Sequence, residues 1–188
     1  KIHSHNDYRQ LVPFYQAYSQ RVSSIEVDVF YRDGQLLVAH DLEELNSAYT
    51  LKSLYVKPIV EQFIKHGGKA WPDSNEKLML MIDIKSSTEP ALSSIISLLN
   101  EFPLVFDQTQ NPNAVRVIIT GNVPDPEYFE NYPTIVSFDG TFYRSYSEDQ
   151  LKRVSMISVP FYNYSRWNGK GSMKKQEKIM VQDAIDKA

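Results

Sequence analysis

The sequence predicts an α/β fold with a parallel sheet, of the TIM (β/α)₈-barrel type. Short β-rich runs alternate with longer stretches of helical period, which is typical of consecutive βα units. Polar residues appear where otherwise apolar strands end, which is where barrel enzymes carry their active sites. The 188 residues are 42% hydrophobic, enough to bury one sizeable core. We therefore expect residues 1–188 to form a single domain.

Strands and helices are expected in alternation along the whole chain. The expected strands are residues 1–5, 24–30, 77–84, 115–120, 134–138 and 154–159. The expected helices are residues 10–21, 51–66, 88–101, 147–153 and 173–187. Three of these helices have start signals, because Thr88, Ser147 and Ser172 can each cap a first turn. The stretches 67–75 and 108–113 are expected to be loops.

The number of strands is smaller than a closed barrel requires. A (β/α)₈ barrel needs eight strands and about 250 residues, whereas the pattern provides about six strands. We expect a barrel that is C-terminally incomplete in this chain, because an open parallel barrel would expose two unpaired edges. A smaller open α/β sheet is the alternative. The chain begins at Lys1 without an initiator methionine, so an upstream segment is expected to have been removed.

Composition excludes several classes of function. The formal net charge is -3, which gives no global field that would attract a nucleic acid. Without cysteine, disulfides and thiolate chemistry are excluded, and only oxygen and imidazole ligands remain for a metal. No stretch approaches the roughly 18 apolar residues of a transmembrane helix. An anionic substrate would therefore have to be bound by a local site.

The strongest chemical signal is the pair Glu26 and Asp28 on a strand of β-branched residues. At the strand period of two, both side chains point to the same face. Burying two carboxylates together is costly unless a cation or a proton offsets their repulsion. A divalent metal explains the pair most simply. The alternative is an amphipathic strand on which Ile25, Val27 and Val29 form the sole buried face.

A second strand ends with a similar pair. Residues 78–82 are apolar, and Asp83 and Lys85 follow two apart. Asp83 would complete a three-carboxylate oxygen site of the kind that Mg²⁺ or Ca²⁺ prefers. Lys85 would offer a positive charge to a phosphoryl oxygen. The alternative is a surface ion pair between Asp83 and Lys85 at the start of a loop.

Three of the four histidines are expected near these carboxylates. His3 and His5 lie on the first strand, and His40 follows a turn at 33–34. His66 precedes two glycines at the end of an expected helix, where a cation favours the helix terminus. We therefore assign His66 a structural role.

These motifs together resemble the phospholipase-C-like phosphodiesterase superfamily. The motifs are His-Ser-His-Asn-Asp at 3–7, Ile-Glu-Val-Asp-Val at 25–29, Asp-Gly at 33–34, Val-Ala-His-Asp at 38–41 and Asp-x-Lys at 83–85. Glycerophosphodiester phosphodiesterases are the nearest well-known members, and the Asp-x-Lys pair is similar to the sphingomyelinase D branch. The Arg-Gly that follows the first histidine in that family is absent, which leaves the substrate open.

The resemblance implies a role for each of these residues. Glu26, Asp28 and Asp83 would bind Mg²⁺ or Ca²⁺, and Lys85 would contact the phosphate. His40 would be one of two acid–base histidines, with His5 preferred over His3 as its partner. Asn6 and Trp167 are candidate substrate contacts, although a solvent-exposed loop is the alternative for Trp167.

The implied activity is metal-dependent hydrolysis of a small phosphodiester, of the glycerophosphodiester or phospholipid head-group class. The nucleophile would be water or a hydroxyl of the substrate itself. A phosphomonoesterase and a non-catalytic barrel that binds a phosphorylated ligand are the alternatives. The resemblance also hints at an exported bacterial protein, periplasmic or secreted.

Overall fold

The computed structural model of the protein describes residues 2–186, which form two compact units. The N-terminal unit comprises residues up to 139 together with 146–156, and the C-terminal unit comprises 140–145 and the residues from 157 onward. That residues 1–188 form a single domain stays a prediction.

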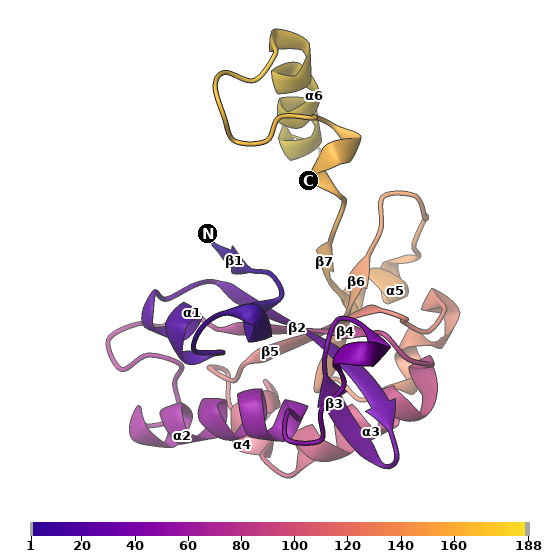
Figure 1. The fold of residues 1–188 in the computed structure, drawn as a ribbon. Helices are drawn as coiled ribbons and strands as arrows, with labels where there is room; N and C mark the ends of the chain where they lie inside the picture. The colour runs from indigo at the N-terminus through magenta and orange to yellow at the C-terminus, as the bar shows by residue number, and fades with distance from the viewer. Residues whose placement is uncertain (1, 187–188) are drawn as a thin grey trace. The chain divides into compact units, whose positions relative to one another are not determined.

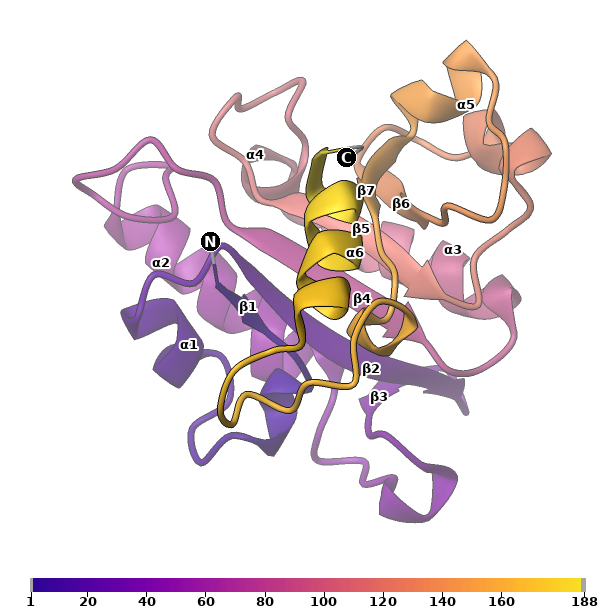
Figure 2. The ribbon, with the colours of Figure 1, turned by 90° about the horizontal axis from the view of Figure 1, so that it is seen from above.

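The N-terminal unit is built on a mainly parallel sheet whose strand order is β1-β2-β4-β5-β6-β7 (Figure 1). Its strands are β1 (His3–Ser4), β2 (Ser24–Arg32), β4 (Met79–Ile84), β5 (Arg116–Gly121), β6 (Val136–Gly140) and β7 (Val154–Ile157). Figure 2 shows β1, β2, β4 and β5 side by side in this order. The α/β class and the parallel sheet are confirmed. Residues 2–186 provide the six strands of this order in the curled sheet, so a closed barrel stays a prediction.

The hydrophobic core lies between one face of the sheet and helices α2 (Lys57–Lys65), α3 (Thr88–Asn100) and α4 (Pro103–Phe106). Figure 1 shows these three helices on one side of the sheet. Ile25, Val27 and Val29 of β2 are buried in this core. Strand alternation turns Glu26 and Asp28 to the opposite face, where they are only 4% and 1% exposed. Both faces of β2 are therefore buried, and the alternative in which Ile25, Val27 and Val29 form the sole buried face is wrong.

Two elements differ from the sequence expectation because of local backbone conformation. The helix expected over residues 10–21 shrinks to α1 (Tyr15–Ser19), since Pro13 and the positive φ of 61° at Phe14 interrupt helical geometry. Strand β3 (Gln35–Val38) was not expected and pairs antiparallel with β2. The turn between them has positive φ at Asp33 and Gly34, as a two-residue hairpin requires.

The other helices follow the expected positions with local exceptions. Residues 51–66 form a π-helical stretch, Lys52–Val56, that continues into α2. Ser147 caps α5 (Glu148–Lys152) in a capping box with Gln150, which confirms that start signal. Thr88 does not cap α3, because Glu89 has non-helical dihedral angles. Short 3₁₀ helices cover Asp7–Arg9, Leu42–Glu44, Pro126–Asn131 and Phe161–Asn163.

The C-terminal unit contains the Phe161–Asn163 turn and helix α6 (Lys175–Asp186). Within it, the Asn163 side-chain amide donates to the Tyr143 hydroxyl at 2.7 Å. Residue 187, the last of the helix expected over 173–187, and residue 1 of the first expected strand lie outside the described residues. None of the helices between residues 2 and 186 combines the length and apolar character needed to cross a lipid bilayer.

Candidate functional site

The register of the parallel strands brings the predicted carboxylates together at one level of the sheet. Asp28 of β2 lies directly beside Asp83 of β4, and Asp83 lies beside Thr120 of β5. Glu26 lies two residues before Asp28 on the same face. One oxygen from each of Glu26, Asp28 and Asp83 lies within 4.8 Å of the others. Three acids from two strands thus form one cluster.

Asp28 is the most heavily contacted member of the cluster. Its Oδ2 accepts a hydrogen bond of 2.7 Å from the Tyr8 hydroxyl and lies 2.7 Å from Nδ1 of His40. Burial opposes ionisation of Asp28, but the bonds from Tyr8 and His40 and the charge of Lys85 outweigh it and lower its pKa. An ionised carboxylate only accepts, so Nδ1 of His40 carries the proton and donates it.

Glu26 has the opposite electrostatic character. Burial, with smaller contributions from Asp28 and Asp83, raises the pKa of Glu26 to about 8. The backbone N–H of Asn6 donates to Glu26 Oε2 at 2.5 Å and only partly opposes this shift. Without a cation, Glu26 therefore holds a proton at neutral pH.

This shift predicts a pH dependence of stability in the presence of a chelator. The pKa of Glu26 is about 8 in the fold against an ordinary value of 4.5, so the folded chain binds this proton more tightly than the unfolded chain does. The stabilisation of the fold by this bound proton is fully present below pH 4.5 and is lost as the pH rises through 8. In Glu26→Gln, the urea midpoint is expected to decline less between pH 5 and 8. Equal slopes for the variant and the parent chain would contradict the assignment.

Asp83 and Lys85 form an ion pair that reaches back to Asp28. Lys85 Nζ lies 2.8 Å from Asp83 Oδ2 and 3.2 Å from Asp28 Oδ1. Burial opposes its charge, but the two carboxylates raise the pKa of Lys85, which therefore stays cationic. The ion pair considered as an alternative is present, but both side chains are largely buried, so it does not lie on the open surface.

Two carboxylate oxygens of the cluster are buried without a hydrogen-bond partner among the described residues. They are Asp28 Oδ1, which Lys85 approaches only as an ion pair, and Asp83 Oδ1. A buried acceptor without a donor is costly, and a cation would satisfy both oxygens. The donor set, three carboxylates, suits a hard divalent cation. Oxygens on opposite sides of a cation are about 4.2 Å apart for Mg²⁺ and about 4.6–5.2 Å for Ca²⁺. The three residues therefore fit a divalent cation.

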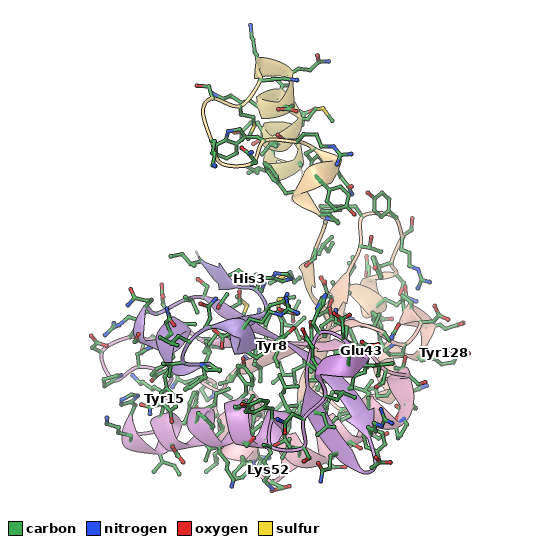
Figure 3. The ribbon with its side chains drawn as sticks, viewed as in Figure 1. His3, Tyr8, Tyr15, Glu43, Lys52 and Tyr128 are labelled. Atoms are coloured by element: carbon green, nitrogen blue, oxygen red, sulfur yellow. The ribbon has the colours of Figure 1, made fainter. Side chains whose placement is uncertain are left out.

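The structure brings one of the three predicted site histidines into direct contact with this cluster. His40 bonds to Asp28, and its backbone N–H donates to Glu44 at 3.2 Å. His3 Nδ1 bonds instead to the Ser24 hydroxyl at 2.7 Å, and its ring centroid lies 6.3 Å from that of His5. Figure 3 shows His3 and Tyr8 on the side of the sheet opposite Lys52. The catalytic roles of the histidines, and the choice between His3 and His5, stay predictions.

The remaining predicted residues have different surroundings. Asn6 lies at the cluster and contacts Glu26 through its backbone. Trp167 belongs to the C-terminal unit, where its indole N–H is shared between the carbonyls of Lys170 and Gly171 at 3.1 Å. His66 ends α2 and bonds to the Tyr18 hydroxyl and the Ala70 carbonyl, as its structural assignment requires. Substrate contacts by Asn6 and Trp167 stay predictions.

Sequence reasoning missed two residues that shape the cluster, Tyr8 and Gly121. Tyr8 follows the predicted Asn6 by two residues, and only the contact with Asp28 reveals it. Gly121 ends β5 with a φ of +73°, and a Cβ there would overlap Asp83 Oδ1. A glycine at a strand end beside a polar row could have been noticed as a point of close approach.

Comparison with known proteins identifies fungal relatives. The Altered inheritance of mitochondria protein 6 homolog of Arthroderma benhamiae is 32% identical over 167 residues, covering 70% of this chain and 52% of that protein. Altered inheritance of mitochondria protein 6 of Eremothecium gossypii is 33% identical over 148 residues, covering 68% and 38%. The Kluyveromyces lactis protein of the same name is 25% identical, covering 86% and 48%. The chain thus spans about half or less of the length of these relatives.

The fungal relatives correct one expectation. The hint at an exported bacterial protein is wrong, because the matching relatives are fungal and point to a eukaryotic protein.

No solved structure matches this chain significantly. The model of the AIM6-like phosphodiesterase domain matches residues 1–132, which include every residue of the acidic cluster, Lys85 and His40. The match supports a phosphodiesterase-like family, but not specifically the glycerophosphodiester or sphingomyelinase D branches. The chain belongs to the AIM6-like phosphodiesterase domain family.

Proposed function

We propose that this chain hydrolyses small phosphodiesters with the help of a divalent cation, Mg²⁺ or Ca²⁺, held by Glu26, Asp28 and Asp83. The observation that carries the proposal is the pair of buried oxygens, Asp28 Oδ1 and Asp83 Oδ1, that accept no hydrogen bond among the described residues and lie beside the Lys85 ammonium group and His40. The membership in a phosphodiesterase-like family supports the reaction class. When bound, the cation would supply Lewis acidity toward a phosphoryl oxygen.

Lys85 and the histidines would carry the remaining roles, which are charge neutralisation and proton transfer. Lys85 lies beside two of the proposed ligands, where its ammonium group can neutralise charge that develops on the phosphoryl oxygens. His40 is held through Nδ1, which leaves Nε2 to take a proton from the attacking oxygen or to give one to the leaving oxygen. His5, with His3 as the alternative, is the proposed partner for the opposite transfer.

The proposed substrate is a glycerophosphodiester or a phospholipid-derived head-group diester. Asn6 is a proposed substrate contact because it lies beside Glu26, and Trp167 is retained as a second one. Next to the cluster, the Thr120 hydroxyl donates to Asp139 at 3.1 Å, which extends the polar row along the sheet toward β6. Polar groups of this kind suit the alcohol portion of such a diester.

For the fold, we propose that the curled sheet is part of an eight-stranded (β/α)₈ barrel.

Assays with chromogenic esters test the proposal. The chain is expected to release nitrophenol from bis(4-nitrophenyl) phosphate with Mg²⁺ or Ca²⁺, and at least about 100-fold more slowly with a chelator, as expected when an essential ion is removed. Faster turnover of 4-nitrophenyl phosphate would instead indicate a phosphomonoesterase. Metal binding without turnover of either ester would indicate a non-catalytic phosphate-binding barrel. Either of these results would overturn the proposed diesterase activity.

A further inference from the structure

The turn Asn6-Asp7-Tyr8, which follows β1, contacts both carboxylates of β2. The Asn6 backbone N–H donates to Glu26 Oε2 at 2.5 Å, and the Tyr8 hydroxyl donates to Asp28 Oδ2 at 2.7 Å. Three consecutive residues thus place a donor on each of two neighbouring acids. The turn is part of the opening motif His-Ser-His-Asn-Asp-Tyr, of which the proposed chemistry uses only the histidine and asparagine positions.

Asp7, between these two donors, anchors the turn in the protein interior. It is fully buried, and its Oδ2 accepts from the Phe14 backbone N–H at 2.6 Å and from the Tyr55 hydroxyl at 3.0 Å. Its Oδ1 accepts from the Ser4 hydroxyl at 2.8 Å. A buried carboxylate with three donors is held in one orientation. Asp7 therefore fixes the backbone from which Asn6 and Tyr8 approach β2.

The contact with Tyr8 also decides which Asp28 oxygen remains available. Oδ2 already receives hydrogen bonds from Tyr8 and His40, whereas Oδ1 accepts none among the described residues and is approached only by the Lys85 ammonium group, as an ion pair at 3.2 Å. Two donors on one oxygen fix the rotation of a carboxylate about its Cβ–Cγ bond. Burial and the bond to Asp28 raise the pKa of Tyr8 far above its usual range, so the hydroxyl keeps the proton that it donates.

We propose that Tyr8 is a positioning residue, which orients Asp28 so that Oδ1 is available to a divalent cation while Oδ2 holds the His40 ring. The inference rests on the proposed function, since it describes how that site is held in place. Asp7 is the buried anchor of the same turn. Partners of this kind around metal ligands fix ligand orientation, and their loss commonly weakens metal affinity or activity by about 10- to 100-fold.

The test is Tyr8→Phe, which removes the hydroxyl and keeps the ring. Affinity for Mg²⁺ and Ca²⁺, measured by titration calorimetry, is expected to weaken by about 10- to 100-fold. In the metal-free protein, ¹⁵N NMR is expected to show one dominant His40 tautomer, with the proton on Nδ1, and a mixture in the variant. If Tyr8 acted only through packing of its ring, neither readout would change, because Tyr8→Phe keeps the ring. Thermal unfolding verifies that the variant is folded.

Tyr15→Phe is the matched control. Tyr15 is exposed, and its hydroxyl contacts Glu61 of α2 at 3.4 Å, away from Tyr8 (Figure 3). This control is expected to leave metal affinity and the His40 spectrum unchanged. An unchanged His40 spectrum in Tyr8→Phe, or an effect equal to that of the control, overturns the inference while diester hydrolysis stands. A Tyr8 effect on the His40 tautomer in a protein that hydrolyses no diester supports the positioning role and overturns the proposed function.

Discussion

Replacing His40 by alanine is expected to lower kcat/KM for bis(4-nitrophenyl) phosphate by about 100- to 10,000-fold, the usual contribution of a positioned acid–base group. The reason is the contact with Asp28, which fixes the ring and leaves Nε2 for proton transfer. Metal affinity is expected to weaken by no more than the roughly 10- to 100-fold expected for Tyr8→Phe, because His40 is the second donor on Asp28 Oδ2, so turnover is compared at saturating metal. Steady-state kinetics with a parallel metal titration checks both parts.

The control for this substitution is His66→Ala. His66 lies at the end of α2 and contacts Tyr18 and Ala70, so its loss is expected to affect thermal stability and not turnover. His5→Ala and His3→Ala, measured in the same series, identify the partner histidine. Replacement of the partner is expected to lower kcat/KM by as much as His40→Ala does. Turnover that survives His40→Ala within about threefold would remove His40 from the proposed mechanism.

Replacing Gly121 by alanine is expected to abolish measurable metal binding and turnover. A Cβ at this position would overlap Asp83 Oδ1 and lie 2.7 Å from the Ile84 backbone carbonyl. The backbone cannot move easily within a paired strand, so the Asp83 carboxylate has to leave its place in the cluster. The φ of +73° adds a destabilisation of at least about 1 kcal/mol. Calorimetric metal titration and thermal unfolding measure the two effects.

Gly67→Ala separates the clash from the backbone strain. Gly67 has a similar φ of +64°, but a Cβ there would meet nothing within 4 Å. Both variants are expected to be destabilised by their positive φ, whereas only Gly121→Ala is expected to lose the metal and the activity. If Gly121→Ala bound Mg²⁺ and Ca²⁺ as the parent chain does, metal binding would not depend on the present position of Asp83.

The sequence alone determined the features that depend on local periodicity. The α/β class followed from alternating strand and helix periods, and the strand period of two placed Glu26 and Asp28 on one face of β2. The helix start at Ser147 followed from residues that are neighbours in the chain, and the structure adds a capping box with Gln150 there. A period is visible without knowledge of any distant contact, which is why these predictions did not need the fold.

The tertiary structure decided everything that depends on register and on loop conformation. The pairing that sets Asp28 level with Asp83, the contact of Tyr8 with Asp28, and the space that Gly121 leaves for Asp83 all join residues far apart in sequence. Phe14, with its positive φ, moved the start of a helix that periodicity had extended over residues 10–21 to Tyr15. Strand register and turn geometry are fixed by long-range packing and backbone hydrogen bonds, which local sequence patterns do not encode.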